Sequence, residues 1–152
     1  MENQENLSKK VVVGGTFDSF HKGHEHLLKK ARSLGEVKIG LTSNKMAKEN
    51  KGVEVEPFED RKEHLLDFLP DAKVEKIEEP IGFSLYEDFD YIVVSDETRL
   101  RAEKINEERE NIGKKRIEIV EVDFYLAQDG KPVSSTRIRE GEIDREGTVI
   151  KK

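Results

Sequence analysis

The sequence contains no cysteine, and this absence excludes three kinds of chemistry. Disulfide bonds, zinc sites built from thiolates and cysteine nucleophiles all need that side chain. Long apolar runs are absent as well: no stretch is long enough to span a bilayer, and the first ten residues, MENQENLSKK, lack the apolar core of a signal peptide. These features predict a soluble, cytoplasmic protein without a membrane partner.

Positive charge is also in short supply. The chain has 27 Lys and Arg residues against 33 Asp and Glu residues, and its formal net charge is −6. Proteins that hold nucleic acid usually present a basic face, so we do not expect nucleic acid among the partners. A nucleotide would have to be held by local groups, namely backbone N–H donors at helix starts and a few lysine or arginine side chains.

The apolar residues fall into short runs and helical stripes, which indicates a folded protein although 39% of the residues are charged. A length of 152 residues suits one domain, residues 1–152. The patterns predict strands at Lys10–Gly15, Glu36–Leu41, Lys73–Ile77, Tyr91–Ser95 and Arg116–Val122, and helices at Lys22–Leu34, Phe58–Leu69, Thr98–Gly113 and from about Ser134. The segment Ser43–Pro57 is predicted to be a lysine-bearing loop with a helical turn at its start.

Strands therefore alternate with helices. This order predicts an α/β fold, a single doubly wound, Rossmann-like domain with a mostly parallel five-stranded sheet. In such sheets ligands lie beyond the carboxyl ends of the strands, where the strand order reverses. The residues that follow Val13, Leu41, Val94 and Val122 are the first candidates for a binding site.

The segment after the first strand has the composition of a phosphate-binding turn. It reads Gly14-Gly15-Thr16-Phe17-Asp18-Ser19-Phe20-His21-Lys22-Gly23-His24. The two glycines allow a close approach of backbone to phosphate, and Thr16 adds a hydroxyl donor. His21 and His24 lie three residues apart at a helix start, so both imidazoles should point the same way. Fixed donors there would stabilise the charge that builds on an α-phosphate under attack, and Gly23 would leave room for the ligand.

A second candidate lies near the C-terminus. Serines and a threonine at the start of a short helix leave several backbone N–H groups that can cradle a phosphate, and an arginine adds positive charge. The residues are Ser134, Ser135 and Thr136, followed by Arg137 and Arg139. Taken alone, this segment would be explained as well by an ordinary helix N-cap.

The histidines also allow other interpretations. They could be surface residues, or His21, His24 and His26 could bind zinc. A zinc site would lack an evident fourth ligand, and the sequence has no H-E-x-x-H motif, so we expect no metal held by the protein itself.

Both segments resemble the cytidylyl- and adenylyltransferase superfamily. Its T/H-x-G-H element follows the first strand and is matched by His21-Lys22-Gly23-His24, with the upstream Gly-Thr-Phe-Asp at Gly15–Asp18. Its I/V-S-S-T-x-x-R element is matched by Val133–Arg139, which places the arginine at Arg139. The resemblance implies that the second element holds the distal phosphates of the nucleotide.

Between these motifs the chain resembles the archaeal and eukaryotic branch of the phosphopantetheine adenylyltransferases, over roughly residues 9–144. The residues that carry this resemblance are Ile39–Ser43, Pro57–Arg61, Val93–Thr98 and Lys104–Glu107. The chain departs from the bacterial enzymes in the region Ser95–Arg101. The resemblance implies a nucleotidyltransferase that acts in coenzyme A biosynthesis, with ATP, 4′-phosphopantetheine and dephospho-CoA as its ligands.

A phosphorylated acceptor also fits the side chains. A phosphomonoester is already ionised at neutral pH and needs no general base, and the sequence shows no paired carboxylates or Ser–His–Asp arrangement to supply one. Positive charge must instead hold two anions together, and the loop after the second strand offers Lys45, with Lys48 as a rival. We expect catalysis by His21, His24 and Lys45, and Mg²⁺ bound mainly through the ATP phosphates.

The expected site is therefore assembled from three groups of residues. The catalytic residues are His21, His24 and Lys45; the ATP and phosphate ligands are Gly14, Gly15, Thr16, Phe17, Asp18, Gly23, Ser134, Ser135, Thr136 and Arg139; and the acceptor ligands are Thr16, Lys45, Lys48 and Arg99.

Three alternatives remain open. The same chemistry could act on another acceptor, as in a cytidylyltransferase for glycerol 3-phosphate or a polar headgroup, or in a mononucleotide adenylyltransferase. The chain could be a module that binds ATP without turning it over, although such a sensor has no use for two donors placed for a transition state. The sequence also leaves open a monomer or a small homo-oligomer.

Overall fold

The computed structural model describes residues 9–79 and 82–150. Its five strands are β1 (Lys10–Gly15), β2 (Glu36–Thr42), β3 (Lys73–Ile77), β4 (Tyr91–Val94) and β5 (Glu118–Glu121). All of the strand pairs are parallel and the order across the sheet is β3-β2-β1-β4-β5. The prediction of a doubly wound, Rossmann-like α/β domain is confirmed, and the sheet is wholly parallel rather than mostly so.

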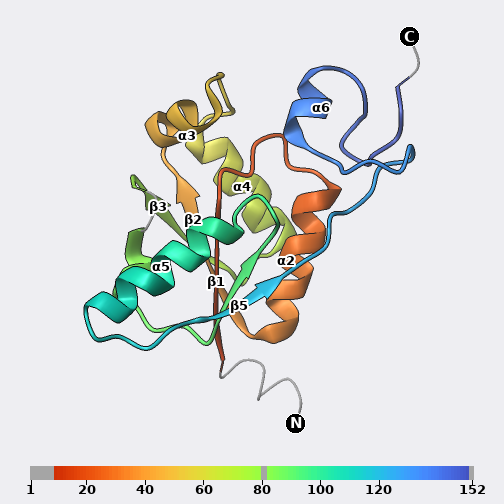
Figure 1. Cartoon of the computed structure of the whole chain (residues 1–152). Helices are drawn as coiled ribbons and strands as arrows, with labels where there is room; N and C mark the ends of the chain where they lie inside the picture. The colour runs from red at the N-terminus through yellow and green to blue at the C-terminus, as the bar shows by residue number, and fades with distance from the viewer. Residues whose placement is uncertain (1–8, 80–81, 151–152) are drawn as a thin grey trace.

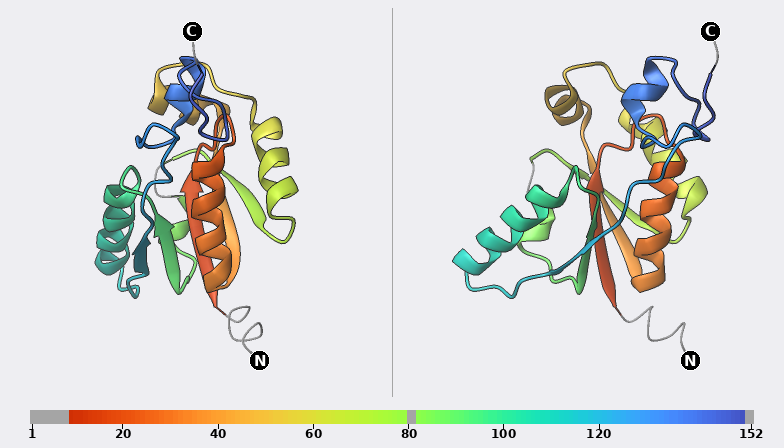
Figure 2. Two further views of the ribbon diagram at one scale, coloured as in Figure 1. Left: turned by 90° about the vertical axis from the view of Figure 1, so that its right-hand side faces the viewer. Right: turned by 45° about the vertical axis from the view of Figure 1, so that its right-hand side comes forward.

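Helices cover both faces of this sheet, as Figures 1 and 2 show. They are α2 (Lys22–Leu34), α3 (Asn44–Lys51), α4 (Phe58–Phe68), the 3₁₀ turn η1 (Gly82–Leu85), α5 (Arg99–Asn111) and α6 (Ser135–Arg139). In the figures α2 and α4 lie on one face and α5 lies on the other, whereas α3 and α6 lie at the end of the sheet where the parallel strands finish.

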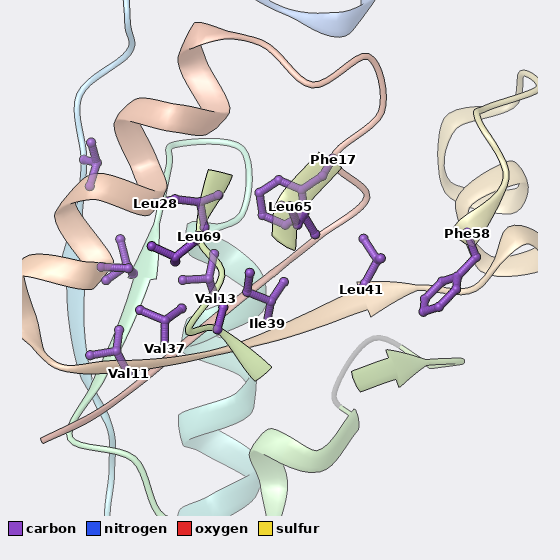
Figure 3. Close-up of a cluster of buried hydrophobic side chains, with 14 residues drawn as sticks. Val11, Val13, Phe17, Leu28, Val37, Ile39, Leu41, Phe58, Leu65 and Leu69 are labelled. Carbon is purple, nitrogen blue, oxygen red and sulfur yellow. The ribbon is translucent and has the colours of Figure 1, made fainter. Parts of the chain in front are cut away.

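Alternation along the strands divides the apolar core in two. Val11 and Val13 of β1 face α2 and α4, where they join Leu28, Ile39 and other buried side chains in the larger cluster (Figure 3). Val12, between them, faces the other way and packs in the cluster under α5. Because side chains on a strand point alternately to the two faces, a run of three valines supplies both layers at once.

Most element boundaries follow the sequence signals. Gly113 ends α5 with φ 78°, and the N–H groups of Gly113 and Lys114 donate to the carbonyls of Glu110 and Arg109. This is the hydrogen-bond pattern of a Schellman cap, which glycine favours because it adopts positive φ without strain. None of the helices in the described part of the chain is long and apolar enough to cross a membrane.

The segment 43–57 contains more helix than the sequence analysis predicted. Instead of one helical turn, α3 runs for eight residues. The Ser43 hydroxyl accepts the N–H of Met46 at its start, and Gly52 closes its end with φ 71°. Both are capping signals, and burial of Met46 and Ala47 against the core stabilises a helix whose polar composition alone gives a weak signal.

Candidate active site

The strand order reverses between β2 and β4, the two neighbours of β1, so the crevice expected in this fold lies beyond the end of β1. The segment that follows β1 there has a constrained backbone. Phe17 and Ser19 adopt φ angles of 53° and 51°, in the left-handed region that side chains other than glycine rarely enter. Such residues persist only where their surroundings hold them, and they are common in functional loops.

Two hydrogen bonds of Glu56 fix this segment. Its carboxylate accepts the N–H of Ser19 at 2.8 Å, and its own N–H donates to the Asp18 carboxylate at 2.9 Å. The Phe17 ring lies in the core cluster and packs 5.1 Å from the His24 ring, centroid to centroid. Phe17 and Asp18 therefore shape the loop from inside the protein.

A fully buried arginine lies beneath the same loop. The Arg61 guanidinium donates to the carbonyls of Thr16 at 3.0 Å and of Thr42 at 2.9 Å, and its Nε donates to the carbonyl of Glu56 at 2.7 Å. It also donates to the Asn44 side chain. A buried cation is stable only when its donors are satisfied. Arg61 consequently fixes the ends of β1 and β2 relative to each other.

His21 and His24 form a reciprocal cap at the start of α2. His21 is the N-cap residue, and its Nδ1 accepts the backbone N–H groups of Gly23 at 3.0 Å and of His24 at 3.3 Å. In return, His24 Nδ1 accepts the backbone N–H of His21 at 3.2 Å. The two rings stack with centroids 3.6 Å apart and planes inclined by 15°. The histidines thus make a capping box in which imidazoles replace the usual serine and glutamate.

This arrangement fixes the protonation of both rings. A nitrogen that accepts an N–H cannot carry a proton, so each neutral ring keeps its proton on Nε2 and can donate from that atom. Burial lowers the pKa of His21 to about 4, and Arg145 and Lys51 add to the effect against the opposing charge of Glu97. Burial, His21 and Lys51 likewise hold the pKa of His24 well below its ordinary value. Two neutral Nε2–H donors result at neutral pH.

Gly23 leaves room for the His21 ring. A Cβ at this position would lie 2.9 Å from Cε1 and 3.0 Å from Nδ1 of the His21 ring, and 3.5 Å from the carbonyl oxygen of Val133. The first distance is shorter than real Cβ contacts show, and the second is tighter than most of them. The glycine therefore lets the His21 ring fold back over the helix end.

The C-terminal segment joins this site through Asp18. Ser135 Oγ donates to the Asp18 carbonyl at 2.6 Å, and Arg139 pairs with the Asp18 carboxylate at 2.8 Å. The side chains of Ala127, Val133 and Ile143 form a small third core that supports this segment. The carbonyl of Arg145 accepts the N–H of Lys22 in the first turn of α2. Residues more than a hundred positions apart therefore meet at the end of β1.

The two segments face a common pocket, which is partly open to solvent and has about 170 Å³ of space that water could enter. Its lining comes from α2, the end of α3, the loops after β4 and β5, and the start of α6. The lining residues are His21, Gly23, His24, His26, Leu27, Lys51, Ser95, Glu97, Val122, Asp123, Phe124, Tyr125, Pro132, Val133, Ser134, Ser135 and Thr136.

Six of the predicted site residues thus line one pocket: His21, Gly23, His24, Ser134, Ser135 and Thr136. Four others lie in the framework behind it. Phe17 and Asp18 are buried, and Arg139 is held by Asp18. The Thr16 hydroxyl accepts a hydrogen bond from Thr42 at 3.0 Å. The roles of these residues toward a ligand remain predictions.

Gly14 lines a second cavity, on the α5 face of the sheet. Gly15 lines neither cavity, and the Phe17 ring lies 3.0 Å from the position that a Cβ of Gly15 would take. This second cavity has mostly apolar walls and only about 30 Å³ of space that water could enter, room for little more than a water molecule. Its lining residues are Val12, Gly14, Gly40, Ile77, Phe83, Ser84, Ile92, Val94, Thr98, Arg101, Ala102 and Ile105.

The structure brings neither Lys45, Lys48 nor Arg99 into these two cavities. Lys45 and Lys48 are exposed on α3, where Lys48 pairs with Glu54 at 3.0 Å. Arg99 pairs with Glu103 and Glu121 on the surface. Arg101, two residues further along, is the arginine of this loop that lines the α5 cavity. The contribution of the first three residues to binding stays a prediction.

Lys51 and Glu97 are site residues that the sequence analysis missed. Both line the pocket, and they pair with each other at 3.2 Å. Gly52, which follows Lys51, marks a helix end, but this signal does not single out Lys51 among the lysines of the segment. Nothing in the sequence distinguishes Glu97 from the many other exposed carboxylates.

The buried cap predicts a specific dependence on pH. Because the pKa of His21 is lowered on folding from 6.5 to about 4, protons bind preferentially to the unfolded chain in this range. Above pH 6.5 His21 is neutral in both states, and its full contribution to the free energy of unfolding is present. As the pH falls toward 4, this contribution is lost, and the free energy of unfolding decreases by roughly 3 kcal/mol because of this group alone. Denaturant titrations at several pH values measure this loss. NMR titration of the His21 ring checks the cause, and a midpoint near 6.5 would contradict it.

Comparison with known proteins identifies the family. Residues 12–141 match the family model described as cytidylyltransferase-like. Phosphopantetheine adenylyltransferase from Methanosarcina barkeri is 48% identical over 93% of each chain, and that from Archaeoglobus fulgidus is 45% identical over 93% of this chain and 99% of the relative. A crystal structure from Archaeoglobus fulgidus, of a protein described as having unknown function, superposes with a TM-score of 0.72 at 37% identity, covering 82% of this chain and 99% of the other. The chain belongs to the cytidylyltransferase-like family and, within it, to the phosphopantetheine adenylyltransferases.

Proposed function

We propose that this chain transfers AMP from ATP to 4′-phosphopantetheine and releases dephospho-CoA and pyrophosphate. The observation that carries this function is the convergence of the capped histidine pair and the Ser134–Thr136 turn on one pocket at the end of β1. Full-length relatives named phosphopantetheine adenylyltransferase, 42–48% identical, support the choice of acceptor.

The reaction is a single in-line displacement at phosphorus. A phosphate oxygen of the acceptor attacks the α-phosphorus of ATP, a new P–O bond forms, and the bond between the α-phosphorus and the bridging oxygen breaks. The electron pair leaves with pyrophosphate. The attacking oxygen is ionised at neutral pH, so no proton has to be removed and no general base is required. Catalysis then depends on positioning and on charge stabilisation.

The histidine pair supplies that stabilisation. Negative charge grows on the α-phosphate as the attack proceeds, and the Nε2–H groups of His21 and His24 are the free donors of their rings. Because both Nδ1 atoms are engaged in the helix cap, the rings cannot turn away without breaking hydrogen bonds. Donors that are already in place need little reorganisation during the reaction. Each such donor lowers the activation free energy by roughly 3 kcal/mol.

The other end of the nucleotide fits the C-terminal turn. Ser134 caps α6 by accepting the N–H of Arg137, and the backbone at Ser135 and Thr136 borders the pocket. We assign the β- and γ-phosphates to this turn and to Arg139, whose guanidinium is oriented by the buried Asp18 carboxylate. We do not assign Arg137 to the phosphates, because its guanidinium pairs with Asp129 and Glu142 and donates to the Pro132 carbonyl.

We assign the acceptor arm to the α5 face of the sheet. The small cavity there lies beside Gly14, where β1 ends, and has mostly apolar walls. Pantetheine is a long, largely uncharged chain, so an apolar face beside the phosphate site suits it, and α5 has to move outward to admit it. Arg101 and Thr98 lie in the same lining and offer polar contacts.

Mg²⁺ is proposed to arrive with ATP. In the described part of the chain, no group of three or more His, Asp or Glu side chains is arranged to hold a metal ion. Mg²⁺ usually keeps several of its waters, so phosphate oxygens and water can supply its remaining ligands. Asp123, in the pocket lining, could accept hydrogen bonds from those waters. When bound, the ion neutralises phosphate charge.

Because both substrates are charged phosphate esters made inside cells, we place the reaction in the cytoplasm.

A panel of acceptors tests the function. The protein is incubated with Mg²⁺ and either ATP or CTP, each with 4′-phosphopantetheine, glycerol 3-phosphate or nicotinamide mononucleotide, and pyrophosphate release is measured. We expect release with ATP and 4′-phosphopantetheine only. Release with CTP and glycerol 3-phosphate would assign the chain to another acceptor, and no release with any pair would leave an ATP-binding module.

Replacing His24 separates binding from catalysis. The change His24→Ala removes one Nε2–H donor, whose main contribution comes in the transition state, so we expect kcat to fall by about a hundredfold or more. The affinity for ATP, measured by calorimetry, should change by less than about tenfold. Equal losses in the two quantities would show that His24 serves substrate binding alone.

Gly23→Ala tests the geometry of the cap. The added methyl group meets the His21 ring at 2.9 Å and has to displace it, so we expect kcat to fall about tenfold or more while the protein stays folded. Lys30→Ala, an exposed position on the same helix, is the matched control and should behave like the parent. Full activity of Gly23→Ala would mean that the ring position is unimportant. Circular dichroism checks that both variants are folded.

A further inference from the structure

Helix α4 presents three side chains to the loop that follows β1. Arg61, His64 and Phe68 are spaced three and four residues apart, so they lie on one face of the helix. Arg61 donates to the Thr16 carbonyl at 3.0 Å, and the Phe68 ring packs 5.6 Å from the Phe20 ring, centroid to centroid. His64 lies between these two residues on the helix. One face of α4 therefore follows the loop that leads to the histidine pair.

The contact of His64 with this loop runs through Glu56. The Nδ1 atom of His64 lies 4.0 Å from Oε1 of Glu56, and the same Oε1 accepts the Ser19 N–H at 2.8 Å. The other carboxylate oxygen lies 3.6 Å from the Arg145 guanidinium. The Glu56 carboxylate is therefore the point at which α4, the loop and the C-terminal segment meet.

The ring nitrogen that faces Glu56 has no partner yet. Within the described part of the chain, Nδ1 of His64 is buried and forms no hydrogen bond. Buried polar atoms nearly always have a partner, so this one requires an explanation. The distance of 4.0 Å to Glu56 exceeds that of a hydrogen bond by about 1 Å, and a small rotation of the imidazole ring about its last torsion can close such a gap.

The Glu56 carboxylate also decides which nitrogen of His64 carries the proton. A neutral imidazole has one proton, on either Nδ1 or Nε2. A lone pair on Nδ1 would face a carboxylate oxygen across a buried gap and be repelled by it, whereas an N–H at the same place is attracted. His64 is therefore expected to be protonated on Nδ1. This is the opposite of His21 and His24, whose Nδ1 atoms accept backbone N–H groups.

The loop needs this support because its backbone is strained. Phe17 and Ser19 have positive φ angles, and such residues keep their conformation only where the surroundings hold them. Glu56 holds Ser19, and two residues later His21 begins the cap of α2. A displacement of Ser19 would therefore move the His21 ring, and small misplacements of a catalytic group reduce rates strongly.

We propose that His64 is a positioning residue for the adenylyl transfer. It donates from Nδ1 to the Glu56 carboxylate and so holds Ser19 and the loop in the form that presents the histidine pair to the α-phosphate. His64 touches neither substrate and transfers no proton. The proposal rests on the function proposed above.

NMR of the imidazole rings tests the position of the proton. In ¹⁵N-labelled protein at about pH 8.5, where an ordinary imidazole is neutral, two-bond ¹H–¹⁵N correlations distinguish the two tautomers. We expect a proton on Nδ1 in His64 and on Nε2 in His21 and His24. The spectrum of His64→Leu assigns the His64 signals. A His64 ring that carries its proton on Nε2 would overturn the proposal.

Two substitutions of His64 test the consequence for catalysis. In His64→Asn the side-chain amide nitrogen takes nearly the place of Nδ1 and keeps a donor toward Glu56, whereas His64→Leu removes the donor. We expect His64→Leu to lower kcat by about fivefold or more with the KM for ATP within about twofold of the parent, and His64→Asn to stay within about twofold in both quantities. Glu63→Leu and Glu63→Asn, on the exposed side of α4, are the matched controls. Equal losses of kcat in the two His64 variants, or a loss below about twofold in His64→Leu, would contradict the proposed role.

Glu56→Gln tests whether His64 acts through Glu56. This change keeps the shape of the side chain but removes the charge that attracts the ring N–H. In this background His64→Leu should have no further effect on kcat. The same fold-change in both backgrounds would show that His64 acts independently of Glu56, contrary to the proposal. Circular dichroism checks that each variant is folded.

Hydrogen exchange keeps this result separate from the overall function. Exchange of the Ser19 amide is measured by NMR in the parent and in His64→Leu, with the Met46 amide, which donates to Ser43, as the internal reference. We expect the Ser19 amide to exchange about threefold faster or more in the variant and the Met46 amide to be unchanged. If the parent forms no dephospho-CoA, the adenylyl transfer is wrong, yet faster exchange would still show that His64 holds the loop. Unchanged exchange of Ser19 would overturn the role of His64 in either case.

Discussion

The buried carboxylate of Asp18 joins the two parts of the candidate active site. It is 3% exposed, and it accepts the Glu56 N–H on one oxygen and the Arg139 guanidinium on the other. The carbonyl of the same residue accepts the Ser135 hydroxyl, 117 positions later in the chain. A buried carboxylate is stable only with such partners, so the loop after β1 and the C-terminal turn stabilise each other. The relative position of these two candidate phosphate-binding segments depends on this residue.

The histidine pair serves the fold with the same rings that we propose for catalysis. Each Nδ1 satisfies backbone N–H groups that would otherwise lack partners at the start of α2, and this engagement leaves Nε2 as the donor of each ring. The helix start therefore selects the tautomer, the stacking and the neutral state of the rings. Gly23 completes the arrangement because a Cβ at this position would displace the His21 ring.

Much of this fold could be predicted from local patterns. The valine run of β1, the glycine that caps α5 and the serine that caps α6 carry their signals within a few residues, and the structure places each element where those signals indicate. The extent of α3 could not be predicted in this way. Its sequence is rich in charge, and its stability depends on burying Met46 and Ala47 against strands that are remote in the chain.

The candidate site likewise combines residues with a local sequence signal and residues that only tertiary contacts bring together. The residue types needed for phosphate chemistry, their spacing and their position after a strand or before a helix are local properties, so the sequence by itself determined the two histidines and the serine-rich turn. Tertiary structure alone decided which charged side chains meet there. Long, flexible lysines and glutamates give no periodic signal, and their partners depend on how strands that are neighbours in space bring distant loops together. For this reason Lys51, Glu97 and the bridging role of Asp18 became visible only in the folded chain.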